Sequence, residues 1–453
     1  MKIIFRRIAL MAVTLLSLTS LTLASLVASP ARAERIQLIR DAEIEDTIGR
    51  YAAPLLRTAG YAPGTVRVYI VHSDELNAFV SGGANIFVTT ELLMRAESPD
   101  QVIGVLAHEL GHIAGGHLTR TREKLRQAST QAIIGWILGA AAAVATGDSQ
   151  AAGALISGGQ QLATQDFLSY SRAQESAADL AGLDFLDRAG ISSRGLLAFM
   201  EVLGEQELLT TARQDPYVRT HPLSRERVAV IARHVDNSPH SDRPPDPVLA
   251  DAHDRMRAKL FGFLNPPSRT LDRYKDGDAI DARIARAIAY HRRPAPADAL
   301  ALADGLIAAE PDNAFFHELK GQILFENARA ADAVPAYARA VALAPNAALI
   351  AIGYAQALLE TRDPKGNEEA IRRLDGALRS ERDNPFAWRL LATAHGRAGR
   401  MGMTALALGE EALLRGERAT AKGQARRALD ILPEGSPAWL RADDILNALE
   451  KDR

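Results

Sequence analysis

The sequence predicts a mainly helical protein with a small β-sheet, arranged as a sheet-containing domain followed by an array of helical repeats. Three observations support this fold class. Aromatic residues make up only 5% of the chain, whereas Ala and Leu are abundant, and this balance favours helices over strands. Two short stretches before residue 91 are β-rich, as strands are. From about residue 278 onward, helical segments recur at a regular spacing.

The overall composition excludes several classes of protein. The 453 residues carry 53 Lys and Arg against 55 Asp and Glu, so a broadly basic surface for nucleic acid is not expected. The chain has no cysteine, which rules out disulfides, iron–sulfur clusters, Cys-ligated zinc and thiol catalysis. Any nucleophile must therefore be Ser, Thr, a carboxylate or a water molecule.

The first 33 residues have the pattern of a secretory signal peptide. A basic start precedes an apolar stretch from Ile8 to Ala28, and Ala31-Arg32-Ala33 forms a small-x-small cleavage site. We therefore expect residues 1–33 to be removed and the mature chain to work outside the cytoplasm. An uncleaved anchor helix is the alternative, because the apolar stretch is long enough to span a bilayer.

Residues 34–240 are predicted to form the first domain. Hydrophobic periodicity and capping residues predict its early elements in order. They are a helix from Asp41 to Gly60, strands at 66–71 and 85–90, a helix at 91–96, and a helix capped by Asp100 that runs to about His117.

An apolar, Gly- and Ala-rich tract occupies residues 132–159 of this domain. Its continuous apolar part covers only residues 132–145, which is too short for an ordinary transmembrane helix. We expect a buried helical hairpin here. The alternative is a segment that contacts a membrane surface or covers a cleft.

The remainder of the chain is predicted to be a linker at 241–277, with one helix at 251–264, and a repeat domain at 278–453. Pro311 and Pro345 lie 34 residues apart in similar turn sequences, and 34 residues is the helix–turn–helix period of tetratricopeptide repeats. Such repeats stack into an α-solenoid whose concave face binds peptides or partner proteins. An irregular Ala-rich bundle is the alternative.

The sequence His108-Glu109-Leu110-Gly111-His112 is the strongest chemical pattern in the chain. Histidines at i and i+4 share one face of a helix, so both imidazoles can bind one metal ion. Glu109 can then accept a proton from a metal-bound water and deliver it to the leaving amine. The pattern predicts a zinc peptidase with one Zn²⁺ per chain.

Zinc needs a third protein ligand, and Glu175 is the best candidate. Asp179 follows it at i+4, so Glu175 can ligate the metal while Asp179 holds a ligating imidazole by its other ring nitrogen. His117 is the rival ligand. On a straight helix it points away from His108 and His112, so we expect it to be structural.

His221 precedes a proline in Thr220-His221-Pro222, which places it in extended or turn backbone beside a cleft. It could occupy the open position of the metal or stabilise an oxyanion. Arg227 could pair with a carboxylate near the zinc.

The segment after Ser81 is a candidate edge for substrate. An extended chain could add to an exposed strand there by main-chain hydrogen bonds. The residues proposed for this edge are Gly82, Gly83, Asn85, Ile86, Phe87 and Val88.

Taken together, these residues resemble the zinc metallopeptidases related to HtpX and the CAAX prenyl protease. The resemblance rests on HELGH at 108–112, Glu175 with Asp179, NAFVSGGANIFV at 77–88, and Thr220-His221-Pro222 with Arg227. It implies a zincin-type metallopeptidase domain with zinc on His108, His112 and Glu175. It also implies that His221 can take the fourth zinc position and hold the enzyme inactive.

The order of signal peptide, catalytic domain and repeats is similar to that of periplasmic members of this family. The resemblance implies degradation of misfolded or stalled outer-membrane proteins, help with their assembly, and docking to the assembly machinery through the repeats. A chaperone or scaffold with a mostly latent zinc site is the alternative function. The complete set of base, ligands and second carboxylate favours the peptidase.

Overall fold

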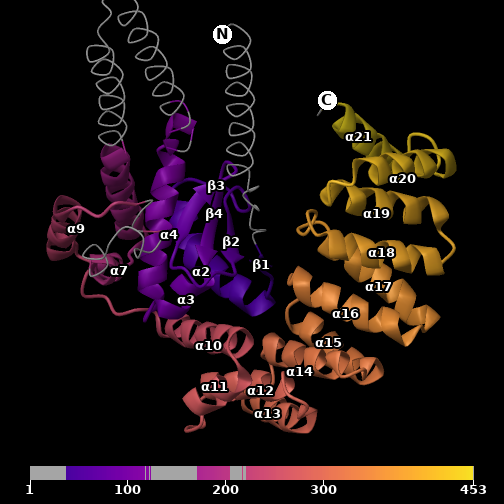
Figure 1. Ribbon diagram of the computed structural model, residues 1–453, viewed down its shortest axis with the longest axis horizontal. Helices are drawn as coiled ribbons and strands as arrows, with labels where there is room; N and C mark the ends of the chain where they lie inside the picture. Colours follow the sequence, from indigo (N-terminus) through magenta and orange to yellow (C-terminus); the bar gives the residue numbers. More distant parts are fainter. Residues whose placement is uncertain are drawn as a thin grey trace, which may run out of the picture. The chain divides into compact units, whose positions relative to one another are not determined.

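The structure, a computed structural model, describes residues 37–117, 119–121, 123, 171–204, 217 and 221–451 (Figure 1). The expected signal peptide at 1–33 and the apolar tract at 132–159 lie outside the described residues. In the described part of the chain, no helix is both long and apolar enough to cross a bilayer. All elements below belong to one unit, Leu38–Arg453.

Four strands of the first domain form one mixed sheet. They are β1 (Leu38–Ile39), β2 (Arg67–Val71), β3 (Ala78–Ser81) and β4 (Asn85–Thr89). Their order across the sheet is β1-β2-β4-β3, with β4 parallel to β2 and antiparallel to β3. The predicted strands at 66–71 and 85–90 correspond to β2 and β4. The sequence pattern misses β1 and β3, which have only two and four residues.

The sheet order contradicts the proposed substrate edge. Asn85, Ile86, Phe87 and Val88 belong to β4, which is an inner strand with β2 on one side and β3 on the other. Both sides of this strand are occupied by ladders, so it cannot accept a further strand. Gly82 and Gly83 form the turn between β3 and β4, where both have positive φ, at 60° and 95°. The outer strand of this hairpin is β3.

The described residues of this domain also form six helical segments, of which α2, α3 and α4 contact the sheet. They are α2 (Ala42–Thr58), α3 (Thr90–Arg95), α4 (Pro99–Ala114), helical residues 171–189, α7 (Arg194–Gly204) and α9 (Arg225–Asn237). Asp41 caps α2 by accepting hydrogen bonds from the N–H groups of Glu43 and Ile44. Asp100 does not cap α4 as predicted. The N-cap is Ser98, and Asp100 lies in the first turn after Pro99.

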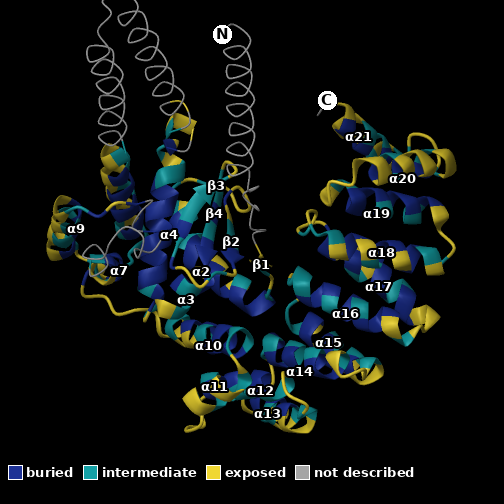
Figure 2. Ribbon diagram, viewed as in Figure 1, coloured by how far each residue is buried: buried dark blue, intermediate teal, exposed yellow. Residues whose placement is uncertain are grey.

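The core of this domain forms where α2, α3 and α4 pack against the sheet. Its largest fully buried side chains include Tyr51, Ile44, Leu55, Leu92 and Ile103. Burying one such apolar side chain contributes about 1.5–3 kcal/mol. Nearly every residue of α4 from Gln101 to Gly111 is buried (Figure 2), so α4 is a central helix on which the surrounding elements are built.

Glycines let two other helices approach the backbone of α4 closely. A Cβ on Gly111 would lie 2.5 Å from the carbonyl oxygen of Ala178, in helical residues 171–189. A Cβ on Gly182, one turn further along that segment, would lie 3.1 Å from the backbone of Ala107. Two turns earlier on the same face of α4, a Cβ on Gly104 would lie 2.8 Å from Leu196 of α7. These contacts hold residues 171–189 directly against the part of α4 that carries the HELGH sequence.

The predicted linker is largely helical. It contains α10 (Pro247–Leu264) and the short α11 (Pro267–Arg273), whereas only one helix was expected. Lys259 of α10 is buried and contacts Asp41 at 2.9 Å and Glu43 at 3.1 Å, both at the start of α2. Arg255 binds Glu310 with contacts of 2.6 and 2.8 Å. Helix α10 therefore joins the first domain to the repeats.

Ten helices follow as antiparallel pairs. They are α12 (Ile280–His291), α13 (Pro296–Ala309), α14 (Ala314–Glu326), α15 (Ala330–Leu343), α16 (Ala348–Thr361), α17 (Pro364–Ala377), α18 (Pro385–Arg397), α19 (Met401–Leu414), α20 (Arg418–Ile431) and α21 (Pro437–Lys451). The first helices of successive pairs start 34, 34, 37 and 33 residues apart. The repeats predicted from the sequence are thus tetratricopeptide-like helical pairs.

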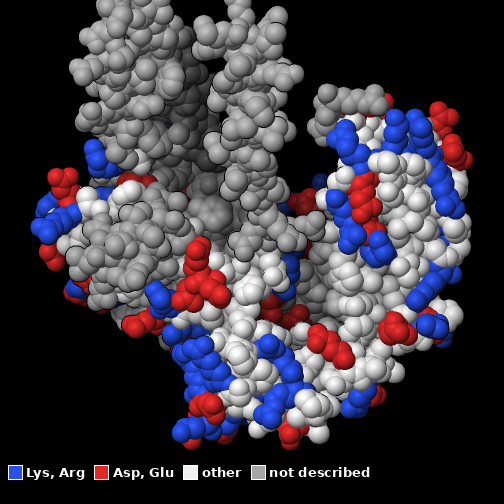
Figure 3. Space-filling model, viewed as in Figure 1, with Lys and Arg blue, Asp and Glu red and all other residues white. Residues whose placement is uncertain are grey.

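The surface of the repeats carries charges of both signs. Figure 3 shows basic and acidic side chains close to one another over the visible face. Ion pairs connect successive segments of the repeats, as Arg339 of α15 contacts Asp312 before α14 at 2.7 Å and Arg400 contacts Glu368 of α17 at 2.8 Å. Exposed pairs of this kind contribute little to stability, about 0–1 kcal/mol each. The stacking of the repeats therefore depends mainly on their apolar contacts.

The close approach at Gly111 gives a testable prediction. Gly111→Ala should destabilise the first domain by about 1–3 kcal/mol, because the added methyl group overlaps the backbone of Ala178 and must push residues 171–189 away. The same displacement should reduce zinc retention, although every predicted ligand is still present. Thermal unfolding and metal analysis of the purified protein would measure both effects.

Gly49→Ala in α2 is the matched control, because a Cβ at Gly49 meets no atom within 4 Å. It should be neutral or slightly stabilising, since alanine is favoured over glycine inside helices. Wild-type stability and zinc content in Gly111→Ala would show that the close approach is not required.

Candidate metal site

Helix α4 presents the two histidines of HELGH on one face, with Glu109 beside them. His108 and Glu109 are fully buried, and His112 is 11% exposed at its side chain. The Nε2 atoms of His108 and His112 lie 3.1 Å apart. Two imidazoles therefore direct a nitrogen to the same point, as the i, i+4 spacing predicts.

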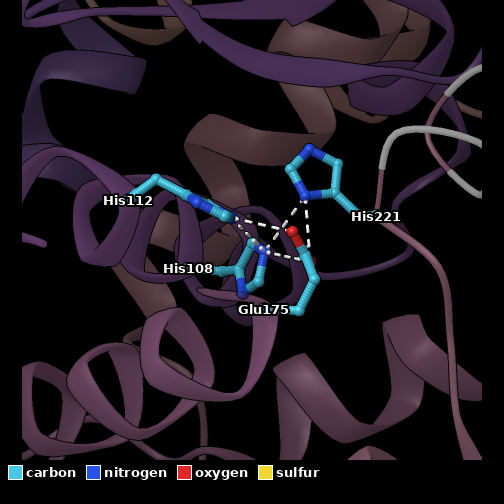
Figure 4. A group of neighbouring side chains, drawn as sticks. All are labelled: His108, His112, Glu175 and His221. Carbon is cyan, nitrogen blue, oxygen red and sulfur yellow. Dashed lines mark hydrogen bonds and ion pairs between the residues drawn. The ribbon is translucent and has the colours of Figure 1, made fainter. Parts of the chain in front are cut away.

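Glu175 reaches this point from helical residues 171–189. One carboxylate oxygen lies 3.4 Å from His108 Nε2, and the other lies 3.4 Å from His112 Nε2. Figure 4 shows the carboxylate and the two rings converging from different elements. Glu175 is only 4% exposed, so its charge is held in an environment of low dielectric constant.

His221 completes the cluster from the loop before α9. Its Nδ1 lies 3.2 Å from Glu175 and 3.3 Å from His108 Nε2, and Figure 4 shows the ring directed at both. Its Nε2 faces Glu109 at 3.5 Å. The ring of Tyr217 stacks on the other side, with a centroid distance of 4.6 Å. His221 thus lies between Glu109 and the other three donors.

Asp179 contacts His108 on the side of the ring that faces away from the cluster, and Arg227 contacts both Asp179 and Glu175. Asp179 lies one turn after Glu175 and approaches His108 Nδ1 at 2.9 Å, on the side of the ring opposite the cluster. Arg227 donates to both oxygens of Asp179, at 2.6 and 2.8 Å, and contacts Glu175 at 3.1 Å. Its remaining contact is with the carbonyl oxygen of Pro222, at 2.9 Å. One guanidinium therefore connects both carboxylates to the loop that carries His221.

The local sequence explains how Arg227 reaches this position. Ser224 caps α9 and accepts a hydrogen bond from the backbone N–H of Arg227 at 3.2 Å. The helix therefore begins directly after the Pro222 loop, with Arg227 in its first turn. Arg227 is 4% exposed, and its charge is balanced by the two carboxylates.

The pKa values of Glu109 and Glu175 are shifted in opposite directions. Burial raises the pKa of Glu109 above its ordinary value, and His221 and His108 oppose that shift. Burial would also raise the pKa of Glu175, but hydrogen bonds from His108 and His221 outweigh it and lower the pKa below its ordinary value. A carboxyl with a raised pKa is suited to proton transfer, and one held ionised is suited to binding a cation.

His117 does not point away from the site as the sequence predicts. Helix α4 ends at Ala114, and Gly116 adopts a left-handed conformation with φ of 63°. The chain therefore turns back, and His117 Nδ1 comes within 3.0 Å of His112 Nδ1. The expectation of a straight helix to His117 was wrong, although His117 still lies outside the four-residue cluster.

The donor set and its spacing fit a zinc ion. His108, His112, Glu175 and His221 each offer one atom, and these atoms lie within 4.8 Å of one another. Zinc binds imidazole nitrogen and carboxylate oxygen in a tetrahedron at about 2.0–2.2 Å. Donors on such a tetrahedron are about 3.3 Å apart, which is close to the 3.1 and 3.4 Å measured among His108, His112 and Glu175.

Comparison with known families agrees with this geometry. Residues 38–235 match peptidase family M48, a range that contains the sheet, α4 and every member of the cluster. Residues 299–410 match the tetratricopeptide domain of cytochrome c-type biogenesis protein H. The second match lies within the helical pairs that begin at α12.

Two proteases are similar to this chain over most of its length, and a third is similar over less than half of it. The beta-barrel assembly-enhancing protease of Escherichia coli K12 is 26% identical over 365 residues, which cover 79% of this chain and 73% of that protein. The same protease of Yersinia pestis is 24% identical over 424 residues, which cover 91% of this chain and 85% of that protein. Metalloprotease LoiP of Escherichia coli is 30% identical over 40% of this chain and 64% of its own.

The domain order, the metal-binding geometry and these similarities agree with the family resemblance inferred from the sequence. The chain contains a peptidase family M48 domain followed by a tetratricopeptide domain, and it is homologous to the beta-barrel assembly-enhancing proteases.

Proposed function

We propose that this protein is an exported, zinc-dependent endopeptidase that works in the periplasm. It cleaves misfolded or stalled outer-membrane β-barrel proteins and assists the assembly of others. The observation that carries the proposal is the convergence of His108, His112 and Glu175 on one point, with the buried carboxylate of Glu109 beside it. This set is what hydrolysis of a peptide bond by a metallopeptidase requires.

Each residue of the site has a distinct task. His108, His112 and Glu175 would hold the zinc ion, which supplies Lewis acidity that polarises a peptide carbonyl and lowers the pKa of water. Glu109 takes the proton of the attacking water on a carboxylate oxygen and passes it to the amine that leaves. Asp179 accepts the Nδ1 proton of His108 and so keeps Nε2 directed at the metal. Arg227 fixes Asp179 and Glu175 relative to each other.

The proposed substrates and partners follow from homology and architecture. The relatives are named as proteases that enhance β-barrel assembly, and unfolded barrel strands are extended segments. An extended chain could add to β3, the outer strand of the hairpin, which packs near α4. The repeats would dock the outer-membrane assembly machinery. The tract at 132–159, for which membrane-surface contact is the alternative to a buried hairpin, lies outside the described residues.

A second function is favoured by the position of His221. With its Nδ1 beside Glu175 and His108, and its Nε2 facing Glu109, the imidazole occupies the side of the cluster where an attacking water must sit. A protein held in this state would act as a chaperone or scaffold with a latent zinc site. The two functions differ in whether His221 leaves the cluster.

Glu109→Gln should abolish peptide cleavage while leaving zinc bound. The amide cannot accept the proton of water, whereas the three predicted ligands are unchanged. Digestion of an unfolded β-barrel protein by the purified variant would be followed on gels, with metal analysis of the same sample. A chelator-treated wild type is the control. Turnover like that of the wild type would contradict the proposed role of Glu109.

His221→Ala should raise basal proteolysis, including self-cleavage, because the imidazole no longer blocks access of water. If His221 instead stabilises the oxyanion, the change should cost about 2.7–4 kcal/mol of transition-state stabilisation and slow turnover about 100- to 1,000-fold. The two roles therefore predict opposite signs for one rate, measured on an unfolded substrate. His240→Ala, a loop histidine outside the cluster, is the matched control.

A further inference from the structure

We propose that His117 is a positioning residue for the metal site, which holds His112 in the ring orientation and tautomer that zinc binding requires. The proposal rests on the zinc peptidase function proposed above. His112 needs a free electron pair on Nε2 to bind a metal, so its ring proton must sit on Nδ1. His117 Nδ1 is 3.0 Å from that atom, with the two rings nearly perpendicular at 79°.

Metal binding by Nε2 of His112 gives the contact with His117 one polarity. Two ring nitrogens 3.0 Å apart can share only one proton, so one donates and the other accepts. With the proton on His112 Nδ1, His117 accepts it and carries its own proton on Nε2. The reverse arrangement would put the proton of His112 on Nε2, where it would face the metal ligands. An acceptor at this position therefore selects the binding form of His112.

The two zinc histidines are thus held by different partners. His108 Nδ1 lies against the carboxylate of Asp179, at 2.9 Å, whereas His112 Nδ1 lies against the imidazole of His117. His112 is also the more exposed of the two, at 11% against 0% for the side chain of His108. Its ring is less enclosed by the protein, so its orientation depends more on a hydrogen-bonded partner.

Gly115 and Gly116 allow the chain to bring the His117 ring against His112. Gly115 continues the helix with its N–H bonded to the carbonyl of Gly111 at 2.9 Å, and Gly116 reverses the chain with φ of 63°. A Cβ on Gly115 would lie 2.3 Å from His117 Nε2, so only glycine leaves room for the returning ring. His117 is 5% exposed, and its carbonyl accepts a hydrogen bond from Gln174, the neighbour of Glu175.

His117 is not itself placed as a ligand. The nitrogen that it directs toward His112 meets Nδ1, which is on the opposite side of that ring from the cluster. The group of donors that could hold one ion consists of His108, His112, Glu175 and His221. His117 therefore acts through His112 rather than on the metal.

Zinc affinity of the full-length protein, measured by competition with a chromophoric chelator, tests the proposal. His117→Leu should weaken binding about 10- to 100-fold, as loss of an outer hydrogen bond to a zinc ligand does. His117→Gln retains an acceptor oxygen and should recover much of the affinity. Gly115→Ala keeps every side chain but displaces the ring, so it should resemble His117→Leu. Gly204→Ala, where a Cβ meets no atom within 4 Å, is the control and should match the wild type.

Cobalt substitution supplies a readout that a merely structural role would not change. The visible absorption bands of Co²⁺ in the wild-type site should shift in His117→Leu and Gly115→Ala but not in Gly204→Ala. Equal zinc affinity and an unchanged cobalt spectrum in His117→Leu would overturn the proposal. If that variant does not fold, wild-type affinity and spectrum in Gly115→Ala overturn it instead. Failure of the wild type to bind zinc would refute the proposed function itself.

Discussion

The proposed metal site depends on the contact between α4 and residues 171–189. HELGH supplies two histidines and a base from one helix, but the third donor must come from elsewhere in the fold. Gly111 and Gly182 remove the side chains that would keep the two segments apart. As a result, Glu175 and Asp179 lie directly against His108, one toward the cluster and one behind it.

The close contact buries several carboxylates together, and Arg227 and the histidines balance the charges of Glu175 and Asp179. Three carboxylates, Glu109, Glu175 and Asp179, are almost completely buried within one site. Unpaired charges in such an environment are costly. The oxygens of Glu109 have no hydrogen-bond partner among the described residues, and burial raises the pKa of this carboxyl. Arg227 neutralises Asp179 and contacts Glu175, and it also binds the loop that carries His221. Arg227, which contacts the proposed ligand Glu175, thus also binds the proposed regulatory loop.

Much of this arrangement could be predicted from the sequence because the signals are local. The i, i+4 spacing within HELGH and between Glu175 and Asp179 fixes which side chains share a face of a helix. The 34-residue period identifies the repeats before any packing is known. The structure brings His108, His112, Glu175 and His221 together, and their roles as ligands remain predictions to be tested.

Two predictions, the substrate edge and the position of His117, were wrong because they depend on features that local sequence patterns do not show. The order of strands in a sheet depends on long-range pairing, so the sequence alone could not show that β4 is an inner strand. A straight helix predicts that His117 points away from the site, whereas Gly115 and Gly116 follow the end of α4 and the chain reverses there. The Gly115-Gly116 pair is the signal that could have corrected this, since glycine after a helix favours a left-handed reversal.

The origin of the third zinc ligand is the central question, and anomalous X-ray scattering at the zinc edge would answer it most directly. Crystals of the zinc-loaded full-length protein should give one strong peak per chain. We predict that this peak lies among His108 Nε2, His112 Nε2 and a carboxylate oxygen of Glu175. A peak coordinated by His117 in place of Glu175, or no peak at this cluster, would contradict the proposed site.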